Sequence, residues 1–210
     1  MINKISLWEE QMDLLAQQDY VVIDNFLNNN ILENVVSFFD AKIEEDKLTK
    51  AAIGSTGDSK IIEEIRGDYT YWLDKARDQN ELLLFDSLDE MQQLINRFFF
   101  LSLSDYEFHL ALYPKGTFYK KHLDQFQGRN NRMISMIIYL NENWKLGDGG
   151  ELKIYPEGKE PSVIEPLMNR CILFRSDTLY HEVLTSNCDR KSITGWMLYQ
   201  STPLAAIPGV

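Results

Sequence analysis

The stretch "MISMIIYLNENWKLGDGGELKIYPEG", residues 133–158, decides the fold class of this chain. It contains two short apolar runs, residues 133–140 and 151–155, and each run is followed by a glycine-containing turn. Runs of this length bounded by Gly, Pro and Asn are typical of antiparallel strands. Five further runs of the same kind lie between residues 107 and 199. We therefore predict an antiparallel sandwich or jelly roll for this half of the chain.

The first 100 residues show a different pattern, in which apolar side chains recur every three or four positions, as in amphipathic helices. An Asn30-x-x-Glu33 pattern ahead of the second series predicts a helix cap. We expect an α+β chain, residues 1–210 as a single domain, with helical support in 1–100 and a jelly-roll core in 105–200. Three series of residues mark the helices: Ile5, Trp8, Met12 and Leu15; Leu32, Val35, Val36, Phe39 and Ile43; Leu84, Leu88, Met91, Ile95 and Phe98.

Composition and charge exclude several classes of protein. Hydrophobic residues make up 44% of the chain, which excludes a disordered protein. The formal net charge is −11, and such a surface repels phosphate backbones, so we expect no nucleic-acid partner. The N-terminus lacks a signal-peptide pattern and no apolar run is long enough for a membrane span. Cys171 and Cys188 are too few for a disulfide framework, and we expect a cytoplasmic protein without a membrane partner.

Candidate metal ligands lie in the strand-rich half. In "HLDQF", residues 122–126, His122 and Asp124 are two positions apart, and such residues leave the same face of a strand. Taken alone, this pair is more typical of a surface turn. His181 lies 57 residues after Asp124, and a jelly roll brings such distant strands together. Two histidines and one carboxylate leave about three of six coordination positions open, as in non-haem Fe(II) oxygenases.

Arg190 follows His181 by nine residues and precedes Ser192 on the same strand face. The planar guanidinium group pairs with a carboxylate through two hydrogen bonds. It would therefore suit the far end of a dicarboxylate cosubstrate whose other end binds the metal. The alternative is a solvated charge beside Lys191, which would be preferred for Arg190 alone. The presence of the three metal ligands favours the anchor.

Together these motifs resemble the 2-oxoglutarate- and Fe(II)-dependent prolyl hydroxylases, in the subgroup of the animal oxygen-sensing enzymes and their bacterial relatives. The resemblance covers about residues 55–200 and implies a double-stranded β-helix, a cupin-like jelly roll. It also implies Fe(II), 2-oxoglutarate and O2, with ascorbate as an optional reductant. Five stretches carry it: "IRGDYTYW" (65–72), "YPKGTFYKKHLD" (113–124), "IIYLNENW" (137–144), "GGELKIYPEG" (149–158) and "ITGWM" (193–197).

The resemblance assigns roles to individual residues. The implied iron ligands are His122, Asp124 and His181. Tyr113, Tyr139 and Trp196 have an alternative role as core packing, since aromatic rings commonly fill such barrels. The remaining histidine, His109 in "EFHLAL", is interpreted as structural. The implied cosubstrate-binding residues are Arg190, Tyr139, Tyr113, Ser192 and Trp196.

The resemblance further implies that the substrate is a prolyl residue in a protein, with transcription factors and components of the translation apparatus as candidates. Residues 51–66 contain Gly54, Gly57 and several small polar side chains, which predicts a mobile loop. We expect this loop to close on the substrate, with Arg66 and Asp68 at its base. The alternative is a passive connector.

Two other functions remain open at this stage. One is a related oxygenase that acts on a small molecule or on alkylated nucleic acid. The other is a catalytically silent cupin-like domain that binds a metal or a partner. A pure binding module has no need of a dicarboxylate anchor, so Arg190 together with the metal ligands argues against it.

Overall fold

The computed structural model describes residues 2–51, 65–125 and 130–199, with side chains from Trp8 onward. Most of the predicted mobile loop, residues 52–64, lies outside the described residues. The described part has three α-helices, none long and apolar enough to cross a membrane. They are α1 (Ile2–Gln18), α2 (Asn29–Glu44) and α3 (Leu82–Phe99), with a 3-10 helix, η1 (Gln79–Glu81), before α3.

Eleven described strands form two antiparallel sheets. All seven runs predicted as strands are strands in the structure. In the larger sheet the order is β1 (Tyr20–Ile23), β9 (Cys171–Arg175), β6 (Arg132–Tyr139), β11 (Arg190–Tyr199), β4 (Leu103–Tyr113), β3 (Tyr69–Trp72) and β2 (Thr49–Lys50). In the smaller sheet it is β5 (Tyr119–His122), β10 (Tyr180–Val183), β7 (Leu152–Tyr155) and β8 (Ser162–Ile164).

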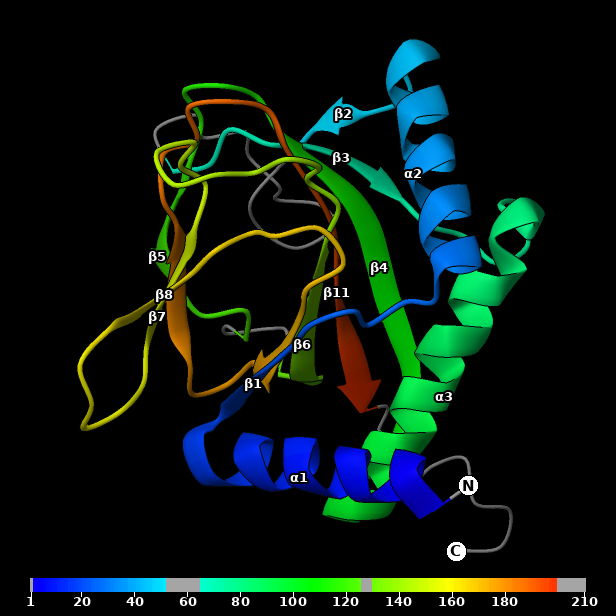
Figure 1. The fold of residues 1–210 in the computed structure, drawn as a ribbon, viewed down its shortest axis with the longest axis vertical. Helices are drawn as coiled ribbons and strands as arrows, with labels where there is room; N and C mark the ends of the chain where they lie inside the picture. Colours follow the sequence, from blue (N-terminus) through cyan, green and yellow to red (C-terminus); the bar gives the residue numbers. More distant parts are fainter. Residues whose placement is uncertain (1, 52–64, 126–129, 200–210) are drawn as a thin grey trace, which may run out of the picture.

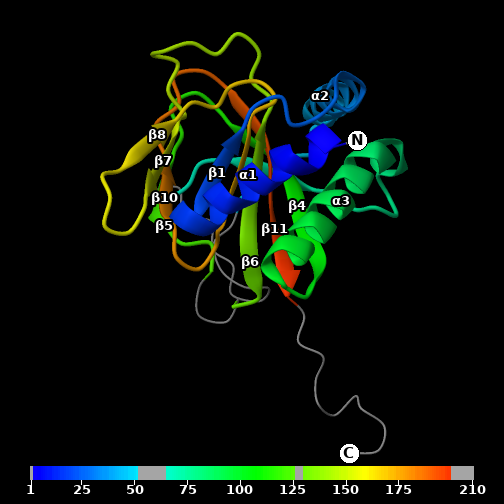
Figure 2. The ribbon, with the colours of Figure 1, turned by 60° about the horizontal axis from the view of Figure 1, so that its bottom comes forward.

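The molecule is built in layers. The smaller sheet faces the larger one, and the three helices cover the outer face of the larger sheet (Figures 1 and 2). One apolar cluster joins the helices to the sheet, and a second lies between the two sheets. Both contain residues of β6: Met136 and Ile138 belong to the helix-side cluster, while Ile137 and Tyr139 belong to the inter-sheet cluster. The two-residue period of the strand therefore divides its side chains between two cores.

The capping prediction for the second helix is wrong by two residues. Asn28, rather than Asn30, is the N-cap: it has extended backbone angles (φ −69°, ψ 158°). Its side chain accepts a hydrogen bond from the backbone N–H of Ile31 at 3.0 Å. The run Asn28–Asn30 offers three candidate caps, and only the residue outside the first turn can have the extended backbone that capping requires.

Candidate functional site

A cavity of about 770 Å³ lies between the two sheets. Side chains from β3, β4, β6 and β11 of the larger sheet line it, together with side chains from β5, β7 and β10 of the smaller sheet. Strands alternate their side chains, so the inward residues of each strand meet here while the outward ones pack elsewhere. Every residue that the sequence singled out as a metal ligand lines this cavity.

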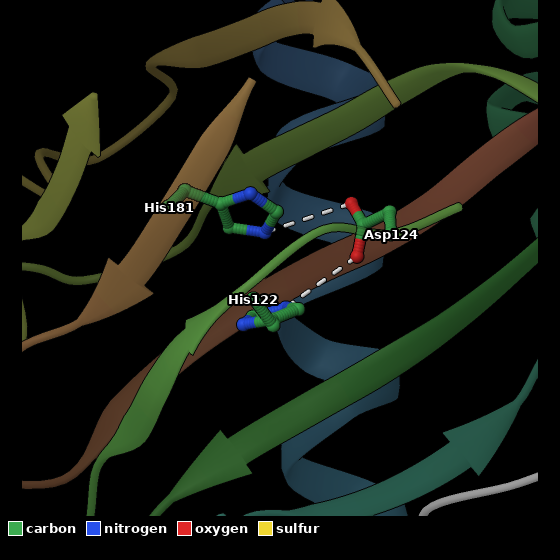
Figure 3. Close-up of side chains that lie close together, drawn as sticks. All are labelled: His122, Asp124 and His181. Atoms are coloured by element: carbon green, nitrogen blue, oxygen red, sulfur yellow. Dashed lines mark ion pairs between the residues drawn. The ribbon is translucent and has the colours of Figure 1, made fainter. Parts of the chain in front are cut away.

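The three predicted metal ligands lie together on neighbouring segments (Figure 3). His122 ends β5, His181 is opposite it on β10, and Asp124 lies two residues beyond the end of β5. The Nε2 atoms of His122 and His181 are 3.5 Å and 3.6 Å from the two carboxylate oxygens of Asp124. One ligand atom from each residue lies within 4.8 Å of the others, so the three side chains could hold one metal ion.

Both histidines direct Nε2 toward Asp124. The Nδ1 atom of His122 is 2.8 Å from the carbonyl oxygen of Lys120, and that of His181 is 3.1 Å from the carbonyl of Leu179. A carbonyl only accepts, so each Nδ1 donates to it, and Nε2 is the nitrogen left to bind a metal. Burial, and then the charge of His122, lowers the pKa of His181 to about 4, so this imidazole is neutral at physiological pH.

Asp124 is buried and is held by Ser135, which in turn contacts Ser176. Ser135 donates a hydrogen bond to its Oδ2 atom at 2.6 Å, and the Ser135 hydroxyl is 2.8 Å from that of Ser176. Burial alone would raise the pKa of Asp124, but His181, His122 and Ser135 outweigh it and hold the pKa well below its usual range. Asp124 is therefore a fixed carboxylate, which suits a hard metal ion.

A buried guanidinium group lies elsewhere on the cavity wall. Arg190 is only 2% exposed, donates from Nε to the carbonyl of Gly150 at 2.8 Å and from Nη1 to Ser192 Oγ at 3.3 Å. Gly150 has a φ of +76°, and a Cβ atom there would be 2.9 Å from the Cδ atom of Arg190. Within the described residues no carboxylate forms an ion pair with Arg190. A buried cation without an anion is costly unless a ligand supplies one.

Two tyrosines flank this guanidinium group. Its Cζ atom is 5.0 Å from the ring centroid of Tyr113 and 4.8 Å from that of Tyr139. The Tyr139 hydroxyl is enclosed and has no hydrogen-bond partner among the described residues. Burial raises the pKa of Tyr139, so the hydroxyl keeps its proton and can donate it. An unpartnered donor beside an unpaired cation fits an anionic oxygen ligand, such as the far carboxylate of 2-oxoglutarate.

The structure places Trp196 away from Arg190. It lines the same cavity but lies six residues along β11, about 20 Å away at the usual strand rise. Its ring lies 5.6 Å from that of His109 and 3.4 Å from the Cζ atom of Arg132. His109, interpreted from the sequence as structural, is on the cavity wall. The sequence contained a signal for this position: His109 and Tyr113 are four residues apart, so their side chains leave the same face of the strand.

Arg66 and Asp68, expected at the base of the loop, form an ion pair. Arg66 donates from Nε to Oδ1 of Asp68 at 2.7 Å and from Nη2 to Oδ2 at 2.5 Å. The Cζ atom of Arg66 is 4.5 Å from the ring centroid of Tyr119, and Arg66 lines the cavity. The pair therefore joins the segment before β3 to the strand that carries His122.

Known proteins share both the sequence and the fold. A sequence model of the 2OG-Fe(II) oxygenase superfamily matches residues 108–198. Mouse prolyl hydroxylase EGLN3 is 32% identical over 211 aligned positions, which cover 93% of this chain and 84% of that protein. The chain belongs to the 2-oxoglutarate- and Fe(II)-dependent prolyl hydroxylase family. This confirms the resemblance, the jelly-roll fold and the expected Fe(II), 2-oxoglutarate and O2.

Two further relatives differ in how much of their own length the match with this chain covers. The hypoxia-inducible factor prolyl hydroxylase of Caenorhabditis elegans is 33% identical over 89% of this chain, which spans only 27% of the nematode protein's length. The crystal structure of a Pseudomonas putida prolyl-4-hydroxylase is 31% identical, with a TM-score of 0.83. That match covers 92% of this chain and 100% of the bacterial one. The chain is thus similar to a whole bacterial enzyme and to part of the nematode protein.

Proposed function

We propose that the protein is a 2-oxoglutarate- and Fe(II)-dependent dioxygenase that hydroxylates a prolyl residue in a protein substrate. The observation that carries the proposal is the pairing, in one cavity, of the group His122, Asp124 and His181 with the buried and unpaired Arg190. A metal alone would need only the first group. A buried guanidinium group in the same cavity adds recognition of a carboxylate, as a dicarboxylate cosubstrate requires.

In this proposal His122, Asp124 and His181 would hold Fe(II), and three protein ligands would leave coordination positions for the cosubstrate and oxygen. The hydrogen bonds from Nδ1 to backbone carbonyls fix both imidazole rings with Nε2 directed toward Asp124. Ser135 fixes the carboxylate of Asp124 in the same way. These outer contacts orient the ligands before the metal arrives, which supports tight and specific binding.

Arg190, Tyr139 and Ser192 anchor the far carboxylate of 2-oxoglutarate, and Tyr113 packs against the guanidinium group. When bound, the iron and cosubstrate supply the oxidation: 2-oxoglutarate becomes succinate and carbon dioxide, and the second oxygen atom enters a substrate C–H bond. The chain's own task is to position the reactants and exclude water. Its burial of Asp124, His181 and Arg190 serves both purposes.

The prolyl substrate is supported by the relatives, whose names describe hydroxylases of proline. The proposed partners are a transcription factor or a component of the translation apparatus, met in the cytoplasm. The acidic chain, with a net charge of −11, disfavours a nucleic-acid substrate. We include closure of the loop over residues 51–66 on the substrate, with Arg66 and Asp68 at its base. The catalytic core is residues 105–200, supported by 1–100 within one domain.

Mass spectrometry of proteins treated with the enzyme tests this proposal. The purified protein, Fe(II) and 2-oxoglutarate are added under ¹⁸O2 to a protein extract of the source cells, with His181→Ala as the matched control. We expect one ¹⁸O atom on a proline of a specific protein, and none with the control. Succinate release accompanied by oxygen on a small molecule, with no proline modified, would instead indicate an oxygenase of another substrate class.

A further inference from the structure

The end of the cavity away from Arg190 is a wall of three rings, Trp72, His109 and Trp196, which we call the ring wall. Trp72 and His109 are paired across β3 and β4, and Thr194 of β11 faces His109 from the other side. The ring centroids of His109 lie 4.7 Å from Trp72 and 5.6 Å from Trp196. Trp72 is 46% exposed, so the ring wall reaches from the interior to the surface.

The ring wall adjoins the metal-ligand group but is separate from the cosubstrate anchor. Arg132 connects it to the ligands: its guanidinium group lies over the ring of Trp196 and its Nη1 donates to the backbone carbonyl of Asp124 at 3.3 Å. His109 and Tyr113 are four residues apart on β4, which corresponds to about 13 Å. A substrate on the ring wall can therefore reach the metal while 2-oxoglutarate occupies the other end.

His109 carries an unexplained polar atom. Its Nδ1 is enclosed without a hydrogen-bond partner among the described residues, and so is Nε1 of Trp196. Such atoms cost stability, and a phenylalanine ring would fill the same space without that cost. Burial, and then the charge of Arg66, lowers the pKa of His109 to about 3, so the ring is neutral. A polar ring kept at a cost to stability points to a ligand contact.

The position of the proton on His109 follows from this enclosure. A neutral imidazole has one N–H donor and one bare acceptor nitrogen. Enclosed N–H groups without partners are rarer than enclosed acceptors, so Nδ1 is the bare nitrogen and Nε2 carries the proton. His109 lines the cavity, and Nε2, unlike Nδ1, is not among the enclosed unpartnered atoms of the described residues, so this N–H group is available to a bound molecule.

A peptide-bound proline matches this arrangement. Proline has no backbone N–H, so an X–Pro segment offers carbonyl acceptors to a binding site. Its ring packs well on aromatic faces. We propose that His109 is the specificity residue for the prolyl substrate: its Nε2–H donates a hydrogen bond to the carbonyl of the target proline, whose ring lies against the ring wall. The inference rests on the proposed function and names the residue that selects its substrate.

Two small probes test this contact in the protein loaded with Mn(II) and 2-oxoglutarate. N-acetyl-L-proline methylamide carries the prolyl carbonyl, and N-acetylpyrrolidine has the same ring without it. Calorimetric titration gives both affinities. We expect the wild-type protein to prefer the first probe about tenfold, the scale of one neutral hydrogen bond. His109→Phe, which keeps the ring, should bind both probes equally.

Stability separates this role from a structural one. His109→Phe removes an enclosed unpartnered nitrogen, so its resistance to urea should equal or exceed that of the wild-type protein. The matched control is Tyr106→Phe on the opposite face of β4, which loses the 2.7 Å hydrogen bond from Tyr106 to Asp89. That control should be less stable than the wild-type protein and should keep the tenfold probe preference.

The outcomes distinguish this inference from the function on which it rests. A His109→Phe variant that keeps the probe preference overturns the role of His109. If that variant does not fold, His109→Gln, which retains an N–H near the position of Nε2, must keep the preference, and its loss there overturns the inference as well. Hydroxyproline formation by the wild-type enzyme is measured separately. The absence of hydroxyproline refutes the proposed function. If hydroxyproline forms but His109→Phe keeps the wild-type probe preference, only this inference is refuted.

Discussion

The two faces of the larger sheet are built from the same strands but differ in chemistry. On β11, Ile193 and Met197 are fully buried in the cluster beneath the helices. The alternate residues Arg190, Ser192 and Trp196 are also buried, but they lie on the face toward the smaller sheet. Apolar burial on the first face stabilises the fold, and it allows polar groups to be buried on the second face at a cost. Neighbouring residues of one strand therefore serve different purposes: one points into the core that stabilises the fold, and the next points into the cavity.

The largest effect should come from removing a metal ligand on the polar face. His181→Ala should abolish Fe(II) or Mn(II) binding and all turnover, because two ligands cannot hold the ion in the same way. Metal binding is measured by calorimetry, and the fold by circular dichroism, which should stay unchanged. Full activity in this variant would show that His181 is not a metal ligand, and the assignment of the chemistry to this face would be wrong.

The next largest effect should come from the apolar face. Ile193→Ala should lower the free energy of unfolding by about 2–5 kcal/mol, the usual cost of a cavity in a core. Urea denaturation of the metal-free protein measures this loss. The folded fraction should bind 2-oxoglutarate as well as the wild-type protein does. A parallel loss of cosubstrate affinity would show that the two faces are not independent.

A smaller effect is expected for the cosubstrate anchor. Arg190→Lys keeps the charge but loses the fork of donors, so 2-oxoglutarate affinity should fall by about 1.5–3 kcal/mol. The matched control is Lys191→Ala, one residue along the strand, where the side chain pairs with Asp40 of α2 at 2.5 Å. That change should leave 2-oxoglutarate affinity unchanged. Equal losses in the two variants would argue for a general disturbance of β11 rather than for the loss of the donor fork.

The smallest effect is expected for Tyr139→Phe. The enclosed hydroxyl has no hydrogen-bond partner in the part of the chain that the structure describes, so we expect its removal to affect only the bound cosubstrate. Affinity for 2-oxoglutarate should fall by about 0.5–1.5 kcal/mol, while the free energy of unfolding stays the same or rises. Unfolding and binding measured on one preparation test both halves of this prediction. A clear loss of stability would mean that the hydroxyl has a structural partner after all.

Much of the site could be predicted from the sequence because its ligands follow local rules. His122 and Asp124 stand two residues apart at a strand end, and periodicity marked seven of the strands that surround them. The apolar pattern did not mark β5, since two exposed lysines in "YKKH" interrupt it, and this strand was expected only from the spacing of His122 and Asp124. The same local reading placed the cap at Asn30, when the backbone needed it at Asn28.

Other features could not be predicted because they depend on register between distant strands. Trp72 meets His109 only because β3 pairs with β4 in one particular alignment. The orphaned nitrogen of His109 is likewise a property of the packed cavity, since the sequence shows only a histidine in an apolar strand.

The central claim is that the group His122, Asp124 and His181 binds one cosubstrate jointly with Arg190. Calorimetric titration of 2-oxoglutarate, with and without Mn(II), tests it most directly. We predict one binding site per chain in the Mn(II)-loaded protein. Affinity should be at least about tenfold weaker, 1.4 kcal/mol, in the metal-free protein and in His181→Ala. Equal affinity with and without the metal would contradict the claim, because 2-oxoglutarate would then bind without contacting the ion.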